Sequence, residues 1–317
     1  MIRPARLALV AAVAAAGLAA AAGTLRTGPR ALQWTTPDAQ LAVLSAEPGS
    51  CLAPAADPQR ARSIAIGAVA FRAPLLLGGQ AARAGLSCSA CHRGGHDNPG
   101  FAYPGLSGAP GTADVTSSLF SSHRGDGAFN PRPIPNLSGD KALLTVDQSP
   151  ARSALESFVN GLIREEFDGP PVPAAVLTGL ADYVRALSPG ACTAPRVIDL
   201  AGALAHIDAA LDNAEWLARM GDGPAARLLV SAARSELGLI DERFALPGLA
   251  RAAAPLRRAG AALGAIERQM ATDPARALPA LQRWRTGAGG WQRPLRSAEP
   301  RSLFNPAVLA RWLGPGS

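Results

Sequence analysis

The sequence predicts an all-α protein, with a first domain of three helices and one long loop followed by a C-terminal helical bundle. Two observations carry this prediction. Apolar residues recur at helical spacing in several segments, and helix-starting residues stand just before several of them. The first domain is expected over residues 31–194 and the helical domain over 195–317.

Helices of the first domain are expected near residues 58–77, 150–166 and 173–187. Asp57 is a favourable N-cap, and Pro58 suits the first position of a helix. Ser149 is expected to cap the second helix. The segment Ser87–Gln148 is rich in Gly, Pro, Ser and Asn, so we expect a long loop that a large prosthetic group would organise.

Beyond residue 194, an apolar stripe with four–three–four spacing predicts a bundle helix. The stripe consists of Leu200, Leu204, Ile207 and Leu211. Further helices are expected near residues 225–237, 249–271, 275–285 and 306–313. Pro255 and Pro279 should kink or shorten two of them. We expect His206 to flank the stripe, and Met220 and Met270 to be packing residues.

The chemically specific motif is Cys88-Ser89-Ala90-Cys91-His92, the C-x-x-C-H pattern of c-type haem attachment. It predicts one covalently attached haem c, held through Cys88 and Cys91, with His92 as the proximal iron ligand. The alternatives are a chance pattern, a redox dithiol or half of a zinc site. A zinc site requires a second ligand pair, but the sequence has no other C-x-x-C, and its one H-x-x-x-H, His92 to His96, begins within the motif itself.

The N-terminus carries an export signal. The short basic segment Met1–Arg6 precedes the apolar run Leu7–Gly23. Residues 1–30 are therefore expected to be a signal peptide or an uncleaved N-terminal membrane anchor. Covalent haem attachment in bacteria takes place outside the cytoplasm, so we expect a periplasmic protein, either free or anchored to the inner membrane.

Cys51 and Cys192 are the two remaining cysteines. In an oxidising compartment they are expected to form a disulfide bond that brackets the haem region. Two free buried thiols are the alternative.

The formal net charge of +7 is unevenly distributed. Residues 195–317 carry 16 arginines and 11 acidic residues, whereas the haem region 31–194 is slightly acidic. The charge is therefore no indication of nucleic-acid binding. The basic C-terminal region or the N-terminal segment could contact a membrane surface or an acidic partner, although a solvated arginine-rich surface explains the same pattern.

Two helix patterns resemble the crossing helices of the cytochrome c family: Gly67-x-x-x-Phe71, and Leu180-x-x-Tyr183-Val184-x-x-Leu187. The order of segments over about residues 60–190 also resembles a single haem domain of di-haem cytochrome c peroxidases, including their methylamine-utilisation relatives. In that family a proline-rich stretch follows the haem motif, as Arg132-Pro133-Ile134-Pro135-Asn136-Leu137 does here. The resemblance implies haem contacts at Pro135 and Leu137. It also implies that a carbonyl near Pro133 or Pro135 accepts a hydrogen bond from His92 Nδ1.

The chain departs from these peroxidases in having one haem motif and in having no methionine between residues 2 and 219. The sixth iron ligand is therefore expected to be a histidine, a lysine or a residue of the C-terminal region, or to be absent. His123 is the first candidate, ahead of His96, Tyr103 and Lys141. Arg124 and Arg132 are expected to pair with the haem propionates.

Two functions follow from these expectations. The first is an exported mono-haem c-type cytochrome that transfers electrons to or from a redox partner protein. The second is a peroxidase-like haem enzyme with an open or labile sixth iron site. A haem-bearing sensor or assembly factor, with the helical region as its partner surface, is a third possibility.

Overall fold

The computed structural model describes residues 28–141, 144 and 146–314. Within these ranges helices dominate, and the strands form two short antiparallel pairs, which confirms the all-α class. The predicted signal peptide or anchor at residues 1–30 lies almost entirely outside the described residues. Among those described, no helix combines the length and the apolar character needed to cross a membrane.

The N-terminal unit is a small group of helices around the long loop. Its α-helices are α2 (Gln40–Ser45), α3 (Pro58–Phe71), α4 (Gly79–Ala84), α5 (Cys88–Cys91), α6 (Ala154–Gly161) and α7 (Ala174–Ala186). Its strands are β1 (Ala46–Glu47), β2 (Thr112–Ala113) and β3 (Arg132–Pro133). Strand β2 pairs with β3, and β1 pairs with β4 (Arg196–Val197). Both strand pairs therefore join segments that are distant in the sequence.

Helices α3 and α7 cross at two glycines. A Cβ atom added at Gly67 would lie 1.9 Å from the carbonyl oxygen of Gly179, far inside van der Waals contact. The helices approach this closely because neither crossing residue has a side chain. The Asp182 carboxylate on α7 accepts hydrogen bonds from Ser63 Oγ and Arg60 Nη1 on α3, each at 2.6 Å. These contacts set the position of the two helices beside the haem motif.

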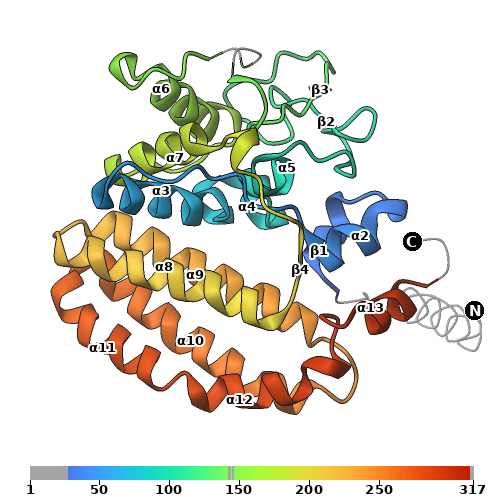
Figure 1. The fold of residues 1–317 in the computed structure, drawn as a ribbon, viewed down its shortest axis with the longest axis vertical. Helices are drawn as coiled ribbons and strands as arrows, with labels where there is room; N and C mark the ends of the chain where they lie inside the picture. The colour runs from blue at the N-terminus through green and yellow to red at the C-terminus, as the bar shows by residue number, and fades with distance from the viewer. Residues whose placement is uncertain (1–27, 142–143, 145, 315–317) are drawn as a thin grey trace, which may run out of the picture.

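The C-terminal unit consists of long helices that pack in layers. Its elements are α8 (Leu200–Arg219), α9 (Gly223–Arg243), α10 (Ala250–Thr272), α11 (Pro274–Thr286), α12 (Gly289–Ala298) and α13 (Pro306–Leu313). Figure 1 shows α3 and α7 above the pair α8 and α9, which in turn lies above α10, α11 and α12. Asp199 and Asp222 cap α8 and α9 by accepting hydrogen bonds from backbone N–H groups in the first turn.

One hydrophobic core extends through both units. Buried residues of α3 and α7 belong to the same cluster as buried residues of α8, α9 and α10. The stripe residues Leu200, Leu204, Ile207 and Leu211 are all buried in this cluster, as their spacing predicts. The helical region is therefore packed against the haem-motif unit through apolar side chains.

Helix boundaries in the N-terminal unit differ from the prediction. Asp57 accepts a hydrogen bond from the Arg60 N–H at 2.7 Å, which confirms the predicted start of α3. However, α3 ends at Phe71 because Pro74, which cannot continue a helix, begins a 3₁₀ turn. Ser149 makes no side-chain capping bond, and α6 begins only after Ser153, which has a φ of 50°.

The C-terminal unit differs from the sequence prediction in helix length, in the exposure of one methionine and in one additional helix. Pro255 and Pro279 lie inside continuous helices and do not shorten them, since each proline removes a single backbone hydrogen bond near the start of a well-packed helix. Met220 is 63 % exposed, whereas Met270 is buried in the core as expected. The sequence did not predict α12, whose interior contains Pro294.

Candidate haem-attachment site

The haem motif forms one helical turn that neighbouring residues hold in place. Gly85, with a φ of 77°, ends α4 and turns the chain into the motif. Helix α5 then presents Cys88 and Cys91 on a single turn. The buried side chain of Asn98 donates from Nδ2 to the carbonyl oxygen of Ala90 at 2.8 Å. The spacing of the two thiols is thus held by backbone geometry and by one buried amide.

His92 is oriented by a backbone carbonyl 43 residues further along the chain. Its Nδ1 donates to the carbonyl oxygen of Pro135 across 3.0 Å. This is the acceptor position that the resemblance implied. The bond places the ring proton on Nδ1 and leaves the Nε2 lone pair available to a metal. Burial lowers the pKa of His92 to about 4, so the imidazole is neutral at pH 7.

The carbonyl of Pro135 is brought to His92 by the pairing of β2 with β3. Thr112 lies opposite Pro133 in this pair, and the Ile134 N–H donates to the Gly111 carbonyl oxygen at 3.0 Å. Leu137, just beyond Pro135, packs against the core. The long loop thus carries short strands and backbone hydrogen bonds, although its sequence has little periodicity.

Burial raises the pKa of Cys88 to about 11 and that of Cys91 to about 12. Both groups are therefore protonated thiols at neutral pH. A redox dithiol of the C-x-x-C type depends on a thiolate at that pH. The electrostatic setting of this pair consequently does not favour the redox-dithiol alternative.

Two aromatic side chains from the crossing helices form a cluster that reaches His92 through Phe71. The Phe71 ring is 6.4 Å from the His92 ring and 5.0 Å from the Tyr183 ring, measured between centroids. Phe71 ends α3, and Tyr183 lies on α7. The approach of the helices at Gly67 and Gly179 therefore also determines the apolar surroundings of the motif histidine.

Several predicted site residues have other partners. The His123 side chain is 61 % exposed, and its Nδ1 lies 2.9 Å from Asp168 Oδ1. Arg124 forms ion pairs with Glu165 and Glu166, each at 2.7 Å. Arg132 is exposed on β3. These contacts connect the loop around residue 123 to residues 165–168, which follow α6.

The other candidates for the sixth iron position also have partners. Nε2 of His96 lies 3.2 Å from the Cys51 sulfur. The Lys141 amine donates to the carbonyl oxygens of Leu137 at 2.5 Å and Val184 at 2.8 Å. The Tyr103 ring packs 5.2 Å from the ring of Phe120.

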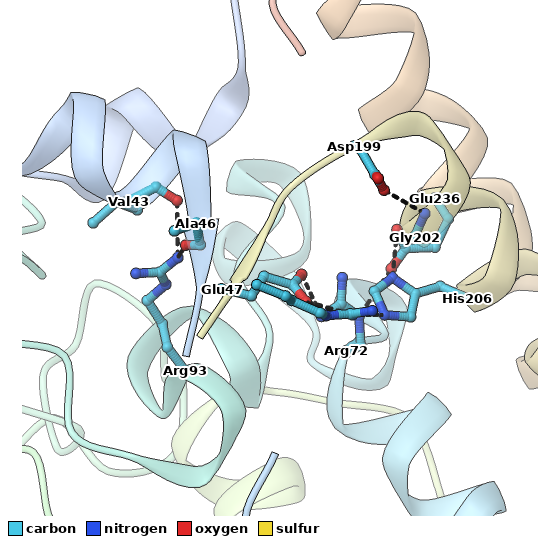
Figure 2. Close-up of polar contacts among 10 residues, drawn as sticks. Val43, Ala46, Glu47, Arg72, Arg93, Asp199, Gly202, His206 and Glu236 are labelled. Atoms are coloured by element: carbon cyan, nitrogen blue, oxygen red, sulfur yellow. Dashed lines mark hydrogen bonds and ion pairs between the residues drawn. The ribbon is translucent and has the colours of Figure 1, made fainter. Parts of the chain in front are cut away.

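Next to the motif, one arginine from each unit donates hydrogen bonds to backbone carbonyl groups at the end of α2. Arg93, the residue after His92, donates from Nη2 to the carbonyl oxygens of Val43 and Ala46 at 2.8 and 2.7 Å (Figure 2). Arg243 of α9 donates to the carbonyl oxygen of Leu44 at 2.9 Å. The C-terminus of a helix carries partial negative charge and unpaired carbonyl groups, so both cations stabilise it.

A half-buried charge network lies next to these arginines. Figure 2 shows Glu47 of β1 beside Arg72, which directly follows α3, with Glu236 of α9 on the other side of that arginine. Glu47 also pairs with Arg196 at 2.6 Å. Burial alone would raise the pKa of Glu47, but the Arg72 charge and the hydrogen bond from Arg196 lower it to about 2. The network joins four segments that are far apart in the sequence. No local sequence pattern predicted it.

His206 belongs to this network. Its Nε2 accepts a hydrogen bond from Arg196 Nη2 at 3.0 Å, and its Nδ1 lies 4.0 Å from Glu236 Oε2. Burial, followed by the charge of Arg72, lowers the pKa of His206. An adjoining cavity of about 230 Å³ is bordered by Arg72, Arg93 and His206 but not by Cys88, Cys91 or His92. Ser89 and Ala90, which lie between the two motif cysteines, also border this cavity.

In comparisons with known proteins, no family model, no curated protein and no solved structure matches this chain.

Proposed function

We propose that this chain is an exported mono-haem c-type cytochrome that transfers electrons. In this proposal one haem c is bonded to Cys88 and Cys91, and His92 supplies the proximal nitrogen. The observation that carries the proposal is the 3.0 Å contact between His92 Nδ1 and the Pro135 carbonyl oxygen. It orients a neutral imidazole that follows directly after the C-x-x-C turn, and its acceptor comes from the distant proline-rich stretch.

The donor set fits a covalently attached haem. Two protonated thiols stand on one helical turn, and the adjoining imidazole is neutral and oriented. When bound, the haem supplies a one-electron redox centre. The chain's own residues would hold the nitrogen that binds the iron: Pro135 orients the His92 ring, and Asn98 holds the turn that carries the thiols. Because these groups are positioned before any electron moves, little rearrangement would accompany the transfer.

The proposal includes the cell compartment and the partners. A signal peptide or anchor within residues 1–30 would direct the chain to the periplasm, where an apocytochrome receives its haem and meets a redox partner protein. The basic region 195–317, or an uncleaved N-terminal segment, would provide contact with a membrane surface. We propose no interaction with nucleic acid.

A peroxidase-like haem enzyme is the second candidate, and the location of the methionines favours it. The sequence has no methionine between residues 2 and 219. Met270 is buried in the C-terminal bundle, and Met220 follows the last turn of α8. The sixth position would then be open or held by a labile ligand.

The first experiment measures haem attachment directly. The chain is matured in a bacterial periplasm, and its intact mass and pyridine haemochrome spectrum are recorded. We expect the mass of the polypeptide plus one haem, and loss of that haem when Cys88 and Cys91 are both replaced by serine. The matched control is the serine pair at Cys51 and Cys192, which should retain haem. Colourless wild-type protein with only polypeptide mass would overturn the proposal.

The second experiment separates the two candidate functions. Spectra of the reduced haem protein are recorded with and without carbon monoxide. A low-spin spectrum that carbon monoxide leaves unchanged indicates a stably six-coordinate electron carrier. A high-spin spectrum that changes with carbon monoxide, together with peroxide turnover, indicates the enzyme.

A further inference from the structure

A second group of sulfur and nitrogen atoms lies apart from the haem motif. Cys51, Cys192 and His96 come from three segments, and one potential ligand atom from each lies within 4.8 Å of the other two. In the structure the two sulfurs are at disulfide-bond distance, 2.00 Å, which agrees with the pairing expected from the sequence. A disulfide requires no imidazole, yet His96 Nε2 lies only 3.2 Å from the Cys51 sulfur.

The ring of His96 lies between a buried hydroxyl group and the Cys51 sulfur. Its Nδ1 lies 3.3 Å from Oγ of Ser138, a buried residue, and its Nε2 faces the sulfur. Histidine ligands in metal sites are commonly held in this way, with one ring nitrogen on an outer hydrogen-bonding partner and the other directed at the metal. Nε2 also lies 3.3 Å from the Gly49 carbonyl oxygen.

The backbone would hold the two cysteines together without the sulfur–sulfur bond. The Ser188 N–H donates to the Cys51 carbonyl oxygen at 2.8 Å, and the Thr193 N–H donates to that of Ser50 at 2.9 Å. Strands β1 and β4 pair just outside this region, with Ala46 opposite Val197. Reduction of the disulfide would therefore leave both thiols close to His96.

We propose that, once reduced, Cys51, Cys192 and His96 form a binding site for a thiolate-preferring divalent cation such as Zn²⁺. A dithiol reductant donates two electrons and two protons to the disulfide and is itself oxidised to a disulfide. Zn²⁺ then displaces the two thiol protons and forms two sulfur–zinc bonds and one nitrogen–zinc bond. Cysteine and histidine are the ligands that Zn²⁺ prefers, and a fourth position is left for water.

Access to the site differs for its two sulfurs. Cys51 is fully buried, whereas Cys192 is exposed. A reductant therefore reaches the sulfur of Cys192 first, and the cation enters from the same side. The site would alternate between a disulfide under oxidising conditions and a metal centre under reducing ones.

The test counts zinc on the full haem-loaded protein. Oxidised and phosphine-reduced samples are incubated with Zn²⁺, passed through a desalting column and analysed for zinc and iron. We expect about one zinc per chain after reduction and none before it. Absence of zinc from the reduced protein, or an equal amount on the oxidised protein, would overturn the proposal.

Substitutions assign the zinc to its ligands. His96→Ala should weaken zinc binding at least tenfold in competition with a chromogenic chelator, because one of three ligands is lost, and Ser138→Ala should weaken it about tenfold. The exposed His123 provides the matched control, and His123→Ala should leave zinc affinity unchanged. If His96→Ala binds zinc as tightly as the wild type, His96 is no ligand and the proposal fails.

The double variant Cys51→Ser/Cys192→Ser distinguishes this proposal from that of haem attachment. We expect it to bind no zinc and to keep its haem. Zinc retained by this variant would be bound elsewhere, and that result would contradict the new site. The iron content of the same sample shows independently whether Cys88 and Cys91 carry haem. If the wild type binds zinc after reduction, the double variant does not, and neither protein contains haem, then the zinc site stands and only the proposed haem function is contradicted.

Discussion

Replacing Gly67 by alanine tests the helix crossing on which the haem-motif surroundings depend. The added Cβ would lie 1.9 Å from the Gly179 carbonyl oxygen and 2.3 Å from its carbon. An ordinary contact begins near 3.4 Å, so α3 and α7 would have to separate by about 1.5 Å at this point. Overpacking of this kind costs about 1–3 kcal/mol. Because the obstacle is backbone and cannot rotate away, we expect about 3 kcal/mol, the upper end of that range.

The assay is urea unfolding at pH 7, followed by far-ultraviolet circular dichroism, with the haem content of each preparation measured alongside. Gly260→Ala in α10 is the matched control. Its Cβ would meet only Leu237 Cδ1, at 3.8 Å, which is ordinary van der Waals contact. There, alanine should stabilise the protein by about 0.5–1 kcal/mol because glycine is a poor helix former.

The two substitutions are chemically identical, so their difference in unfolding free energy isolates the crossing. We also expect Gly67→Ala to carry less haem, since Phe71 would move away from His92. If Gly67→Ala proved as stable as Gly260→Ala, the helices would not approach as described and the reasoning would be wrong.

Three further predictions concern the surrounding network. The pKa of Glu47 falls from 4.5 to about 2 on folding. This shift contributes about 3 kcal/mol to the free energy of unfolding. The contribution should be present above pH 4.5 and lost as the pH falls towards 2. Urea unfolding at pH 7 and pH 3 should show about 2 kcal/mol of that loss in the wild type and a much smaller loss in Glu47→Gln. Equal losses would contradict the ion-pair assignment. Asn98→Leu leaves the Ala90 carbonyl oxygen without its buried donor, so the free energy of unfolding should fall by about 1–3 kcal/mol and the haem yield should fall as well. An unchanged melting curve would show that this hydrogen bond does not stabilise the motif turn. Cys51→Ser/Cys192→Ser should lower the unfolding free energy by about 2–5 kcal/mol, and reduction of the wild type should have a similar effect in the absence of metal.

Local sequence signals predicted much of the secondary structure. The apolar stripe from Leu200 to Leu211 identified α8, since a repeat of three and four residues faces one side of a helix. Asp57 followed by Pro58 identified the start of α3. These predictions succeeded because each depends on residues within a few positions of one another. The end of α3 and the start of α6 were misplaced where Pro74 and Ser153 interrupt the expected helices.

The sequence by itself determined the motif at residues 88–92, the pairing partner available to Cys51 and the helical class of the fold. Only the tertiary structure decided which groups surround them. It brought the carbonyl of Pro135 to His92, His96 to the Cys51 sulfur, and Glu47 between Arg72 and Arg196. The physical reason is that these contacts join residues far apart in the chain, whose distances depend on how whole helices pack. A short spacing pattern records which chemical groups are present, but not which distant carbonyl or charge will face them.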